Sequence, residues 1–201
     1  MHGAEVPHFP DTVEAKRALR RRLLQARRDR SPASLALDGE AISVHVATLP
    51  QVRAGACVAA YVSAGTEPST DRTLEALRER GVRVLLPVLL ADDDLDWAAY
   101  AGPTAWRTGR RGLREPDAPA LGTHAVAEAD LVLVPGLAVS DSGHRLGRGG
   151  GSYDRALARV APDVVTAVVL HPDEVGLPVP VEPHDRPVDA AVTRDGVTWL
   201  D

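Results

Sequence analysis

Short apolar runs alternate with amphipathic segments along most of the chain. Four of the runs have the length and composition of buried strands, at residues 58–62, 82–86, 131–134 and 164–170. Residues 71–80 and 154–160 show helical periodicity, and each segment lies between two of those runs. A strand, a helix and a strand at this spacing are typical of a parallel βαβ unit. The pattern predicts an α/β fold, a three-layer Rossmann-like sandwich with a mostly parallel central sheet flanked by helices.

Two further helices are expected ahead of the first strand. One begins near Thr12 and runs to about Arg30, and the second is opened by Pro32. Residues 1–10 hold two prolines, which oppose regular structure. The length of 201 residues suits one core rather than two. We therefore expect a disordered start, followed by a single α/β domain over residues 11–201.

The remaining segments carry weaker patterns. Pro87 is expected to stop the second strand, because proline has no backbone N–H to offer a neighbouring strand. Residues 95–101 are predicted to form another strand, and residues 102–128 a long polar loop. The proline-rich residues 177–187 are expected to be extended, and residues 188–193 are predicted to form an edge strand.

Composition excludes several classes of protein. The formal net charge is −5, which argues against broad nucleic-acid binding, and no apolar run approaches the length of a membrane span. The first residues carry none of the basic and apolar regions of a signal peptide. The single cysteine, Cys57, excludes an internal disulfide and lies in an apolar run, as a buried small hydrophobe does. We expect a cytoplasmic protein without membrane or nucleic-acid partners.

One cation differs in kind from all the others. Of the 23 Lys and Arg residues, only Lys16 is a lysine. Lys16 and Arg20 are four residues apart on the predicted helix and share a face, where an anion bound to both would offset their repulsion. A compact ammonium is a usual partner of nucleotide phosphates, although a lysine kept by chance explains the composition equally well. The other basic residues of this helix are predicted to form a solvated face, namely Arg21, Arg22, Arg27, Arg28 and Arg30.

A glycine-rich turn between a predicted strand and a predicted helix concentrates the candidate chemistry. Its residues are Arg145, Leu146, Gly147, Arg148, Gly149, Gly150, Gly151, Ser152, Tyr153 and Asp154. The glycines allow backbone N–H groups to close on a ligand, and the two arginines supply forked donors for phosphate or carboxylate oxygens. Asp154 lies in the first turn of the helix, where it would cap the helix or hold a metal ion beside the anion. The alternative is a flexible turn with solvated arginines, since the spacing matches neither a P-loop nor a dinucleotide fingerprint.

A long gapless stretch resembles the signature of a known family. Residues 135–155, PGLAVSDSGHRLGRGGGSYDR, are similar to the motif of the 5-formyltetrahydrofolate cyclo-ligases, also called 5,10-methenyltetrahydrofolate synthetases. Ser140 stands where the family has Asp, Ser152 replaces the first of two tyrosines, and Glu174 stands where many relatives have Gln. Further segments carry the resemblance in the same chain order, at Lys16 with Arg20, Tyr61 with Glu67 and Thr70, Glu115 with Pro116, and Asp185 with Asp189.

The resemblance implies an activity and its co-substrates. The reaction is the closure of 5-formyltetrahydrofolate to 5,10-methenyltetrahydrofolate, in which ATP is converted to ADP and phosphate and Mg²⁺ is the cofactor. The implied ATP-binding residues are Lys16, Arg20, Arg145, Leu146, Gly147, Arg148, Gly149, Gly150, Gly151, Ser152 and Tyr153. The implied folate-binding residues are Val62, Glu67, Arg148, Gly149, Gly150, Gly151, Ser152 and Tyr153. The implied magnesium ligands are Asp154 and Asp189.

Other functions stay open at this point. A non-catalytic relative that binds folate or a nucleotide would keep the fold, and the serines at positions 140 and 152 are compatible with it. RNA binding by residues 20–30 is disfavoured by the acidic balance and by the lack of stacking aromatic residues. Fold similarity alone would also admit a sugar-phosphate isomerase or a CoA-transferase. The expected partners are 5-formyltetrahydrofolate and ATP, bound to a monomer or weak homodimer. Trp106 and Tyr153 are candidates for packing on a pterin ring, while Trp97 is expected in the core.

Overall fold

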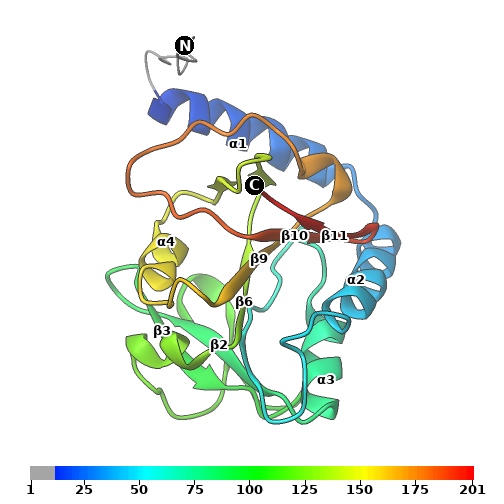
Figure 1. Cartoon of the computed structure of the whole chain (residues 1–201), viewed down its shortest axis with the longest axis vertical. Helices are drawn as coiled ribbons and strands as arrows, with labels where there is room; N and C mark the ends of the chain where they lie inside the picture. Colours follow the sequence, from blue (N-terminus) through cyan, green and yellow to red (C-terminus); the bar gives the residue numbers. More distant parts are fainter. Residues whose placement is uncertain (1–11) are drawn as a thin grey trace.

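The computed structural model describes residues 12–201, and a seven-stranded mixed sheet runs through its centre (Figure 1). The strand order is β11-β10-β9-β6-β1-β2-β3. The strands from β10 to β2 are parallel to one another, whereas β11 and β3 pair antiparallel at the two edges. The strand bounds are Cys57–Ala59 for β1, Arg83–Leu89 for β2, Leu95–Ala99 for β3, Leu131–Pro135 for β6, Val165–Val169 for β9, Ala190–Thr193 for β10 and Gly196–Trp199 for β11. This sheet confirms the predicted α/β class, and the disordered start expected over residues 1–10 lies outside the described residues.

Helices cover both faces of the sheet, which gives three layers (Figure 1). Ile42 of α2 and Leu74 of α3 pack on one face, whereas α4 and the 3-10 helix η2 pack on the other. Within β1, Val58 belongs to the first face and Ala59 to the second, because successive strand residues point to opposite sides. The helix bounds are Thr12–Arg28 for α1, Pro32–Val46 for α2, Asp71–Glu79 for α3, Ser152–Leu157 for α4 and Thr123–Glu128 for η2.

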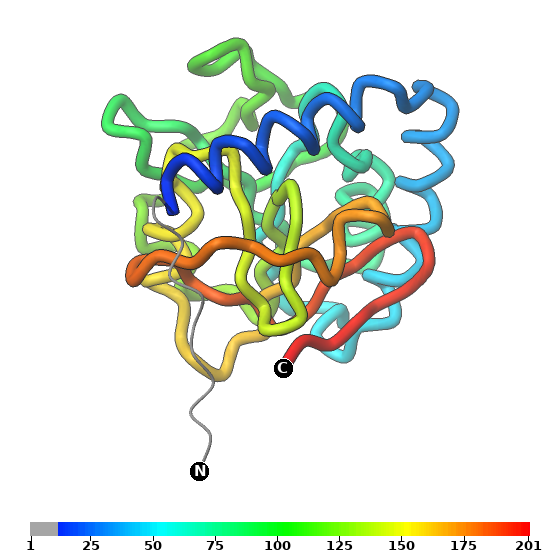
Figure 2. The backbone as a smooth tube through the Cα atoms, turned by 90° about the horizontal axis from the view of Figure 1, so that it is seen from above, coloured from blue at the N-terminus to red at the C-terminus, as the bar shows by residue number. Residues whose placement is uncertain are grey.

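The first helix, α1, crosses the carboxyl end of the sheet (Figure 1). Its Leu23 packs with Leu137 and Leu146, which follow the carboxyl end of β6. Figure 2 shows the extended segment 177–187, which we call the strap, running alongside the same helix. Helix α1 and the strap, which are far apart in the sequence, therefore meet at the edge where α/β sheets bind their ligands.

The second strand continues through Pro87, so the prediction that this proline stops it is wrong. Pro87 pairs with Trp97 of β3. The carbonyl of Leu85 accepts from Ala60 N–H, so the backbone groups of Leu85 point toward β1. The backbone groups of successive residues point to opposite neighbouring strands, so those of Pro87, two residues later, also point toward β1. β1 has already ended at that level, so the missing N–H of the proline costs no ladder hydrogen bond.

The polar segment 102–128 is more ordered than the predicted loop. It contains a hairpin of β4 (Trp106–Thr108) and β5 (Arg114–Pro116), with the 3-10 helix η1 (Arg110–Gly112) at its tip. Strands of three residues are too short to display a period of two, which is why the pattern missed them.

The predicted edge strand at residues 188–193 is an inner strand. β11 pairs antiparallel with β10 and forms the edge in its place. The dipeptide Asp195-Gly196, at the turn into β11, is a recognised hairpin signal that could have indicated this pairing.

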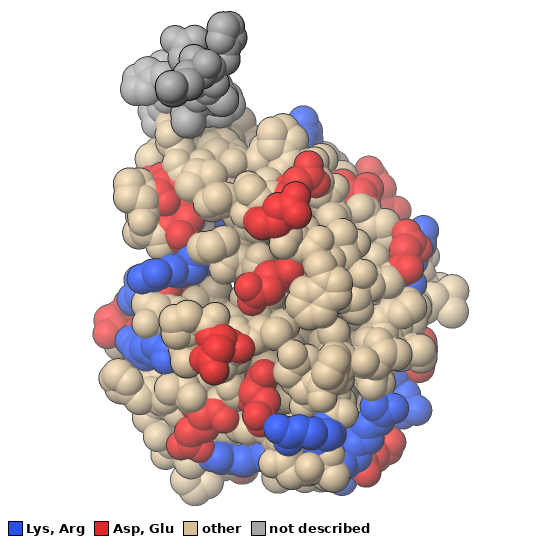
Figure 3. Space-filling model, in the orientation of Figure 1, with Lys and Arg blue, Asp and Glu red and all other residues tan. Residues whose placement is uncertain are grey.

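The described surface mixes both signs of charge. Figure 3 shows acidic and basic side chains interspersed over one face. On α1, for example, Arg17 pairs with Glu14 at 2.9 Å. None of the helices among residues 12–201 is long and apolar enough to cross a membrane. Cys57 and Trp97 are buried, as predicted.

Candidate functional site

A cavity of about 350 Å³ opens at the carboxyl end of the sheet, between α1, the glycine-rich turn and the β4–β5 hairpin. Its wall contains Lys16, Arg20, Val62, Glu67 and every residue from 145 to 154. All the predicted binding residues except Asp189 therefore face one space. A cavity of this size lies at the lower end of the range for small-molecule sites.

The glycine-rich turn follows a short hairpin of β7 (Ala138–Val139) and β8 (Arg145–Leu146). A Cβ atom at Gly147 would lie 2.8 Å from Nη1 of Arg145, so only glycine leaves room for that guanidinium. Gly149 and Gly151 have φ angles of 103° and 68°, a left-handed region that side-chain-bearing residues rarely adopt. The turn is thus shaped by its glycines around the Arg145 side chain.

Arg145 is a buried cation with a free donor. Its Nη1 donates to the carbonyl of Pro135 at 3.1 Å, and its Nη2 donates to Oδ1 of Asp154 at 3.1 Å. Its Nε is buried and has no hydrogen-bond partner among residues 12–201. A buried, unpaired donor on a positive group is costly unless a ligand satisfies it. Arg145 also lines the cavity, so its guanidinium places a positive charge beside that space, which suits an anion.

Two cations of α1 reach the cavity from the opposite side. Arg20 donates from Nε to the carbonyl of Gly147 at 2.9 Å, which joins the helix to the glycine-rich turn. Lys16 lies one turn earlier and is 3% exposed. Its Nζ lies 2.7 Å from Oε2 of Glu182 and 2.6 and 2.9 Å from the two oxygens of Asp185, both on the strap. An ammonium has three N–H donors, and all three have carboxylate acceptors here. A phosphate near Lys16 must therefore share these donors with the carboxylates or replace one of the carboxylates.

The other end of the cavity holds Glu67. Its Oε2 accepts from Ala64 N–H at 2.9 Å, and its Oε1 accepts from Nε of Arg148 at 3.1 Å. Two tyrosines lie nearby: burial first, and the Glu67 carboxylate second, raise the pKa of Tyr61 and of Tyr153 far above the usual range. Both phenols therefore stay protonated and can donate hydrogen bonds to a substrate.

Asp189 does not lie with Asp154, which corrects the predicted pair of magnesium ligands. Its Oδ2 accepts from the backbone N–H of Thr166 at 2.7 Å and from the hydroxyl of Thr166 at 2.9 Å. Thr166 lies near the amino end of β9, three residues before Val169, which pairs with the last residue of β6. At about 3.3 Å per residue, Asp189 is on the order of 10 Å from the carboxyl edge that holds Asp154. The two carboxylates cannot share one ion in this fold.

Two of the three departures from the family motif, Ser140 and Glu174, have a structural explanation, and nothing in the structure explains the third, Ser152. Ser140 ends one side of the β7–β8 turn, and its hydroxyl accepts from His144 N–H at 3.1 Å, as an aspartate in a turn would. Ser152 opens α4 and lines the cavity. Glu174 is 1% exposed and forms a two-point ion pair with Arg27 at 2.6 and 2.7 Å. The charge of Glu174 therefore has a buried counter-charge.

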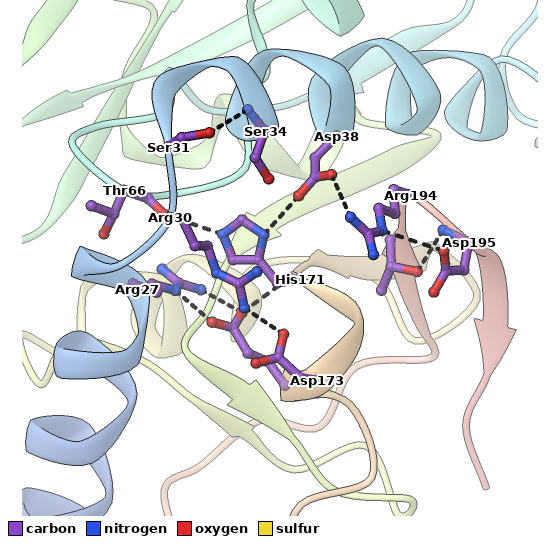
Figure 4. Close-up of polar contacts among 12 residues, drawn as sticks. Arg27, Arg30, Ser31, Ser34, Asp38, Thr66, His171, Asp173, Arg194 and Asp195 are labelled. Carbon is purple, nitrogen blue, oxygen red and sulfur yellow. Dashed lines mark hydrogen bonds and ion pairs between the residues drawn. The ribbon is translucent and has the colours of Figure 1, made fainter.

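Arg27 corrects the prediction of a solvated arginine face on α1. Its side chain, labelled in Figure 4, is fully buried. Besides Glu174, it contacts the carbonyl of Gly136 at 2.7 Å. Arg21, Arg22 and Arg28 are exposed, as predicted. Helical periodicity alone could have warned of this, because Arg27 is four residues from Leu23 on the inward face.

Several residues that line the cavity were not predicted from the sequence. Glu182 was not considered, although it forms a turn with Asp185, whose Oδ2 accepts from Glu182 N–H at 2.7 Å. Arg111 and Arg114 also line the cavity, because the β4–β5 hairpin folds over its mouth. No local pattern indicated their position, since it depends on where the hairpin packs.

Comparisons with known proteins find relatives of one kind. The model of the 5-formyltetrahydrofolate cyclo-ligase family matches residues 12–194. The 5-formyltetrahydrofolate cyclo-ligase of Mycolicibacterium smegmatis is 41% identical over 192 residues, which cover 92% of this chain and 97% of the relative. The protein of the same name from Escherichia coli K12 is 30% identical over 176 residues, covering 86% and 97%. The NMR structure of Aquifex aeolicus 5,10-methenyltetrahydrofolate synthetase matches with a TM-score of 0.76 and 27% identity, covering 92% of each chain.

Proposed function

The chain belongs to the 5-formyltetrahydrofolate cyclo-ligase family, and we propose that it closes 5-formyltetrahydrofolate to 5,10-methenyltetrahydrofolate at the expense of ATP. The reaction needs activation, because the oxygen of an N-formyl amide is a poor leaving group. The formyl oxygen attacks the γ-phosphorus of ATP, and ADP leaves. The folate N10 then attacks the resulting iminium carbon, and inorganic phosphate leaves with the former formyl oxygen and the N10 proton.

The nucleotide is assigned to the end of the cavity where α1 meets the glycine-rich turn. Lys16, Arg20 and Arg145 line this end and supply cationic donors there. The glycines let the backbone approach the phosphates closely. In phosphoryl transfer the protein acts mainly by positioning and by neutralising charge, which is what this set of residues can do.

The folate is assigned to the end that holds Val62 and Glu67. Arg148, whose guanidinium contacts Glu67, lies between the two ends of the cavity. It can reach the place where the γ-phosphate of ATP would meet the formyl group. The protonated phenol of Tyr153 adds a donor at the same place. A carboxylate that accepts hydrogen bonds from a pterin N–H group would orient the ring toward the phosphates.

Asp154 is assigned to the magnesium ion. Its carboxylate lines the cavity at the start of α4, beside Arg145. Magnesium in nucleotide sites is usually held by one or two carboxylates together with phosphate oxygens and water, so one aspartate suffices. The bound ion would neutralise phosphate charge, while Asp154 fixes its place relative to the glycine-rich turn.

The observation that carries the proposal is the convergence of the two remote motifs on one cavity. Lys16 and Arg20 come from the first helix and residues 145–154 from beyond the middle of the chain, and they meet across the bond from Arg20 to Gly147. A structural scaffold would not require an ammonium, an unpaired guanidinium donor and a carboxylate around the same space.

One assay tests the proposal. Purified protein mixed with 5-formyltetrahydrofolate, ATP and magnesium should produce the absorbance of the methenyl product, and omission of ATP or chelation of the metal should abolish it. Absence of product at enzyme concentrations equal to those of the substrate would reject the activity. We further propose that the enzyme acts in the cytoplasm. We also propose that it is a monomer or weak homodimer, and light scattering can check this oligomeric state.

A further inference from the structure

A cluster of buried polar groups lies behind the cavity, between α2, the loop after β1 and the end of β9 (Figure 4). His171 is at its centre and has no exposed surface, while Asp38 and Glu174 are 2% and 1% exposed. None of these three side chains lines the cavity. Buried polar and charged groups are costly unless every one is paired, so their partners indicate what the cluster holds in place.

The two ring nitrogens of His171 contact two different segments. Nδ1 lies 3.2 Å from Oδ2 of Asp38 on α2, and Nε2 lies 3.2 Å from the carbonyl oxygen of Thr66. Both partners are acceptors, so the ring donates to Thr66 when Nε2 carries a proton and to Asp38 when Nδ1 carries one. Arg194 donates to the other oxygen of Asp38 at 3.3 Å. The plane of the imidazole ring is therefore fixed.

The backbone of His171 is anchored as well. Its N–H donates to Oε2 of Glu174 at 3.0 Å, and Glu174 is held by Arg27 of α1. Arg27 in turn donates to the carbonyl of Gly136, directly after β6. His171 is thus tied to the helix and strand that form the nucleotide end of the cavity, and its ring projects from that rigid base toward Thr66.

Thr66 immediately precedes Glu67, the carboxylate assigned to the folate. The loop between β1 and α3 contains neither helix nor strand, and Gly65 has a φ of 63°. Within it, the carboxylate of Glu67 accepts from Ala64 N–H, which is a local contact. The bond from His171 to the Thr66 carbonyl is a contact from a distant part of the chain to the peptide that leads into Glu67. Loss of that bond would leave this peptide with only a local hydrogen bond, from Glu67 N–H to the Ala64 carbonyl at 3.3 Å.

We propose that His171 is a positioning residue for the folate substrate: its Nε2 holds the Thr66 carbonyl and so keeps the Glu67 carboxylate on the cavity wall. The inference rests on the proposed function, because that function assigns Glu67 to the folate. His171 acts through Glu67 and touches neither substrate. A histidine that served only to fill the core would affect stability without separating the two substrates.

Two variants of similar size separate the two ring contacts. In His171→Gln the amide nitrogen occupies the position of Nε2 and can still donate to Thr66, whereas in His171→Asn it occupies the position of Nδ1 and can reach only Asp38. We expect His171→Asn to raise KM for 5-formyltetrahydrofolate about 10-fold, the effect of one lost hydrogen bond, with KM for ATP changed less than about 2-fold. His171→Gln should raise KM for the folate less than about 3-fold.

Two controls make the outcome decisive. Val192→Ala removes buried volume from β10 without altering a polar contact, and it should lower the melting temperature while leaving both KM values in place. In a Glu67→Ala background, His171→Asn should add no further increase in KM for the folate, because the two residues act as one unit. An unchanged folate KM in His171→Asn, or an equal rise for both substrates, would overturn the inference. Failure of the wild-type protein to form product would instead reject the proposed function itself.

Discussion

Lys16 and Arg27 are two buried cations on the same face of α1, yet they serve different purposes. They are eleven residues apart, so they project about 20° from one another around the helix axis. Lys16 is 3% exposed and Arg27 fully buried, and each meets carboxylates from the last thirty residues of the chain. The cavity is lined by Lys16 and not by Arg27. Burial and pairing alone therefore do not identify a functional cation.

The chemistry of the two side chains explains the difference. Burial alone would lower the pKa of Arg27, but the hydrogen bond and charge of Glu174 outweigh this effect and raise it. Its planar fork is held at fixed geometry by Glu174 and by the Gly136 carbonyl. The Lys16 ammonium is a point charge on a flexible stem, beside open space, and can exchange one acceptor for another. We expect a structural role for Arg27 and a binding role for Lys16.

The largest expected effect is on stability, from Arg27→Ala. Removing the arginine leaves the Glu174 carboxylate buried without its partner, which should lower the free energy of unfolding by about 3–5 kcal/mol. Urea denaturation measures this change. Arg28→Ala is the matched control, because Arg28 is the exposed neighbour and should change stability by less than about 0.5 kcal/mol. Equal losses in the two variants would contradict the structural role of Arg27.

The counterpart is Lys16→Ala, which should affect turnover more than stability. Loss of one electrostatic contact to the transition state should reduce turnover at least about 10²-fold. Steady-state assays of the methenyl product measure the turnover number, and the turnover number of Arg27→Ala is the comparison. A near-normal rate for Lys16→Ala would mean that the ammonium only anchors the strap.

Asp154 and Asp189 allow a similar comparison for the proposed magnesium site. Asp154→Asn should also reduce turnover about 10²-fold, because its carboxylate faces the cavity. Asp189→Asn should keep turnover within about 3-fold and lower stability by about 1 kcal/mol, since its carboxylate accepts two hydrogen bonds from Thr166. Magnesium titrations of both variants complete the test. A weakened magnesium dependence in Asp189→Asn alone would reverse the two assignments.

The smallest effect is expected from Asp173→Ala. Asp173 pairs with Arg30 next to the Arg27–Glu174 pair, but its side chain is 62% exposed. Exposed ion pairs contribute about 0–1 kcal/mol, so the loss in unfolding free energy should stay below about 1 kcal/mol. Denaturation in low and high salt should show that this small contribution is screened. A loss as large as that of Arg27→Ala would show that exposure does not separate the two pairs.

The sequence indicated those features that depend on neighbouring residues. The apolar runs placed the strands β1, β2, β6 and β9, and the glycines and arginines marked residues 145–154 as a stretch that lines the cavity, because a turn of this kind is built from adjacent residues. Arg27 and Pro87 were misjudged because their surroundings come from remote segments, Glu174 for the first and the early end of β1 for the second. Asp189 was assigned by resemblance alone, and its place at the amino end of β10 could be seen only in the folded sheet.

The contact between Lys16 and the strap spans nearly the entire chain. Glu182 and Asp185 lie 166 and 169 residues beyond the lysine they hold. During synthesis on the ribosome, α1 emerges long before its acidic partners, so the Lys16 end of the cavity is completed late. A nascent chain without residues 182–185 would carry a Lys16 ammonium without these two partners and a cavity wall that lacks Glu182 and Asp185.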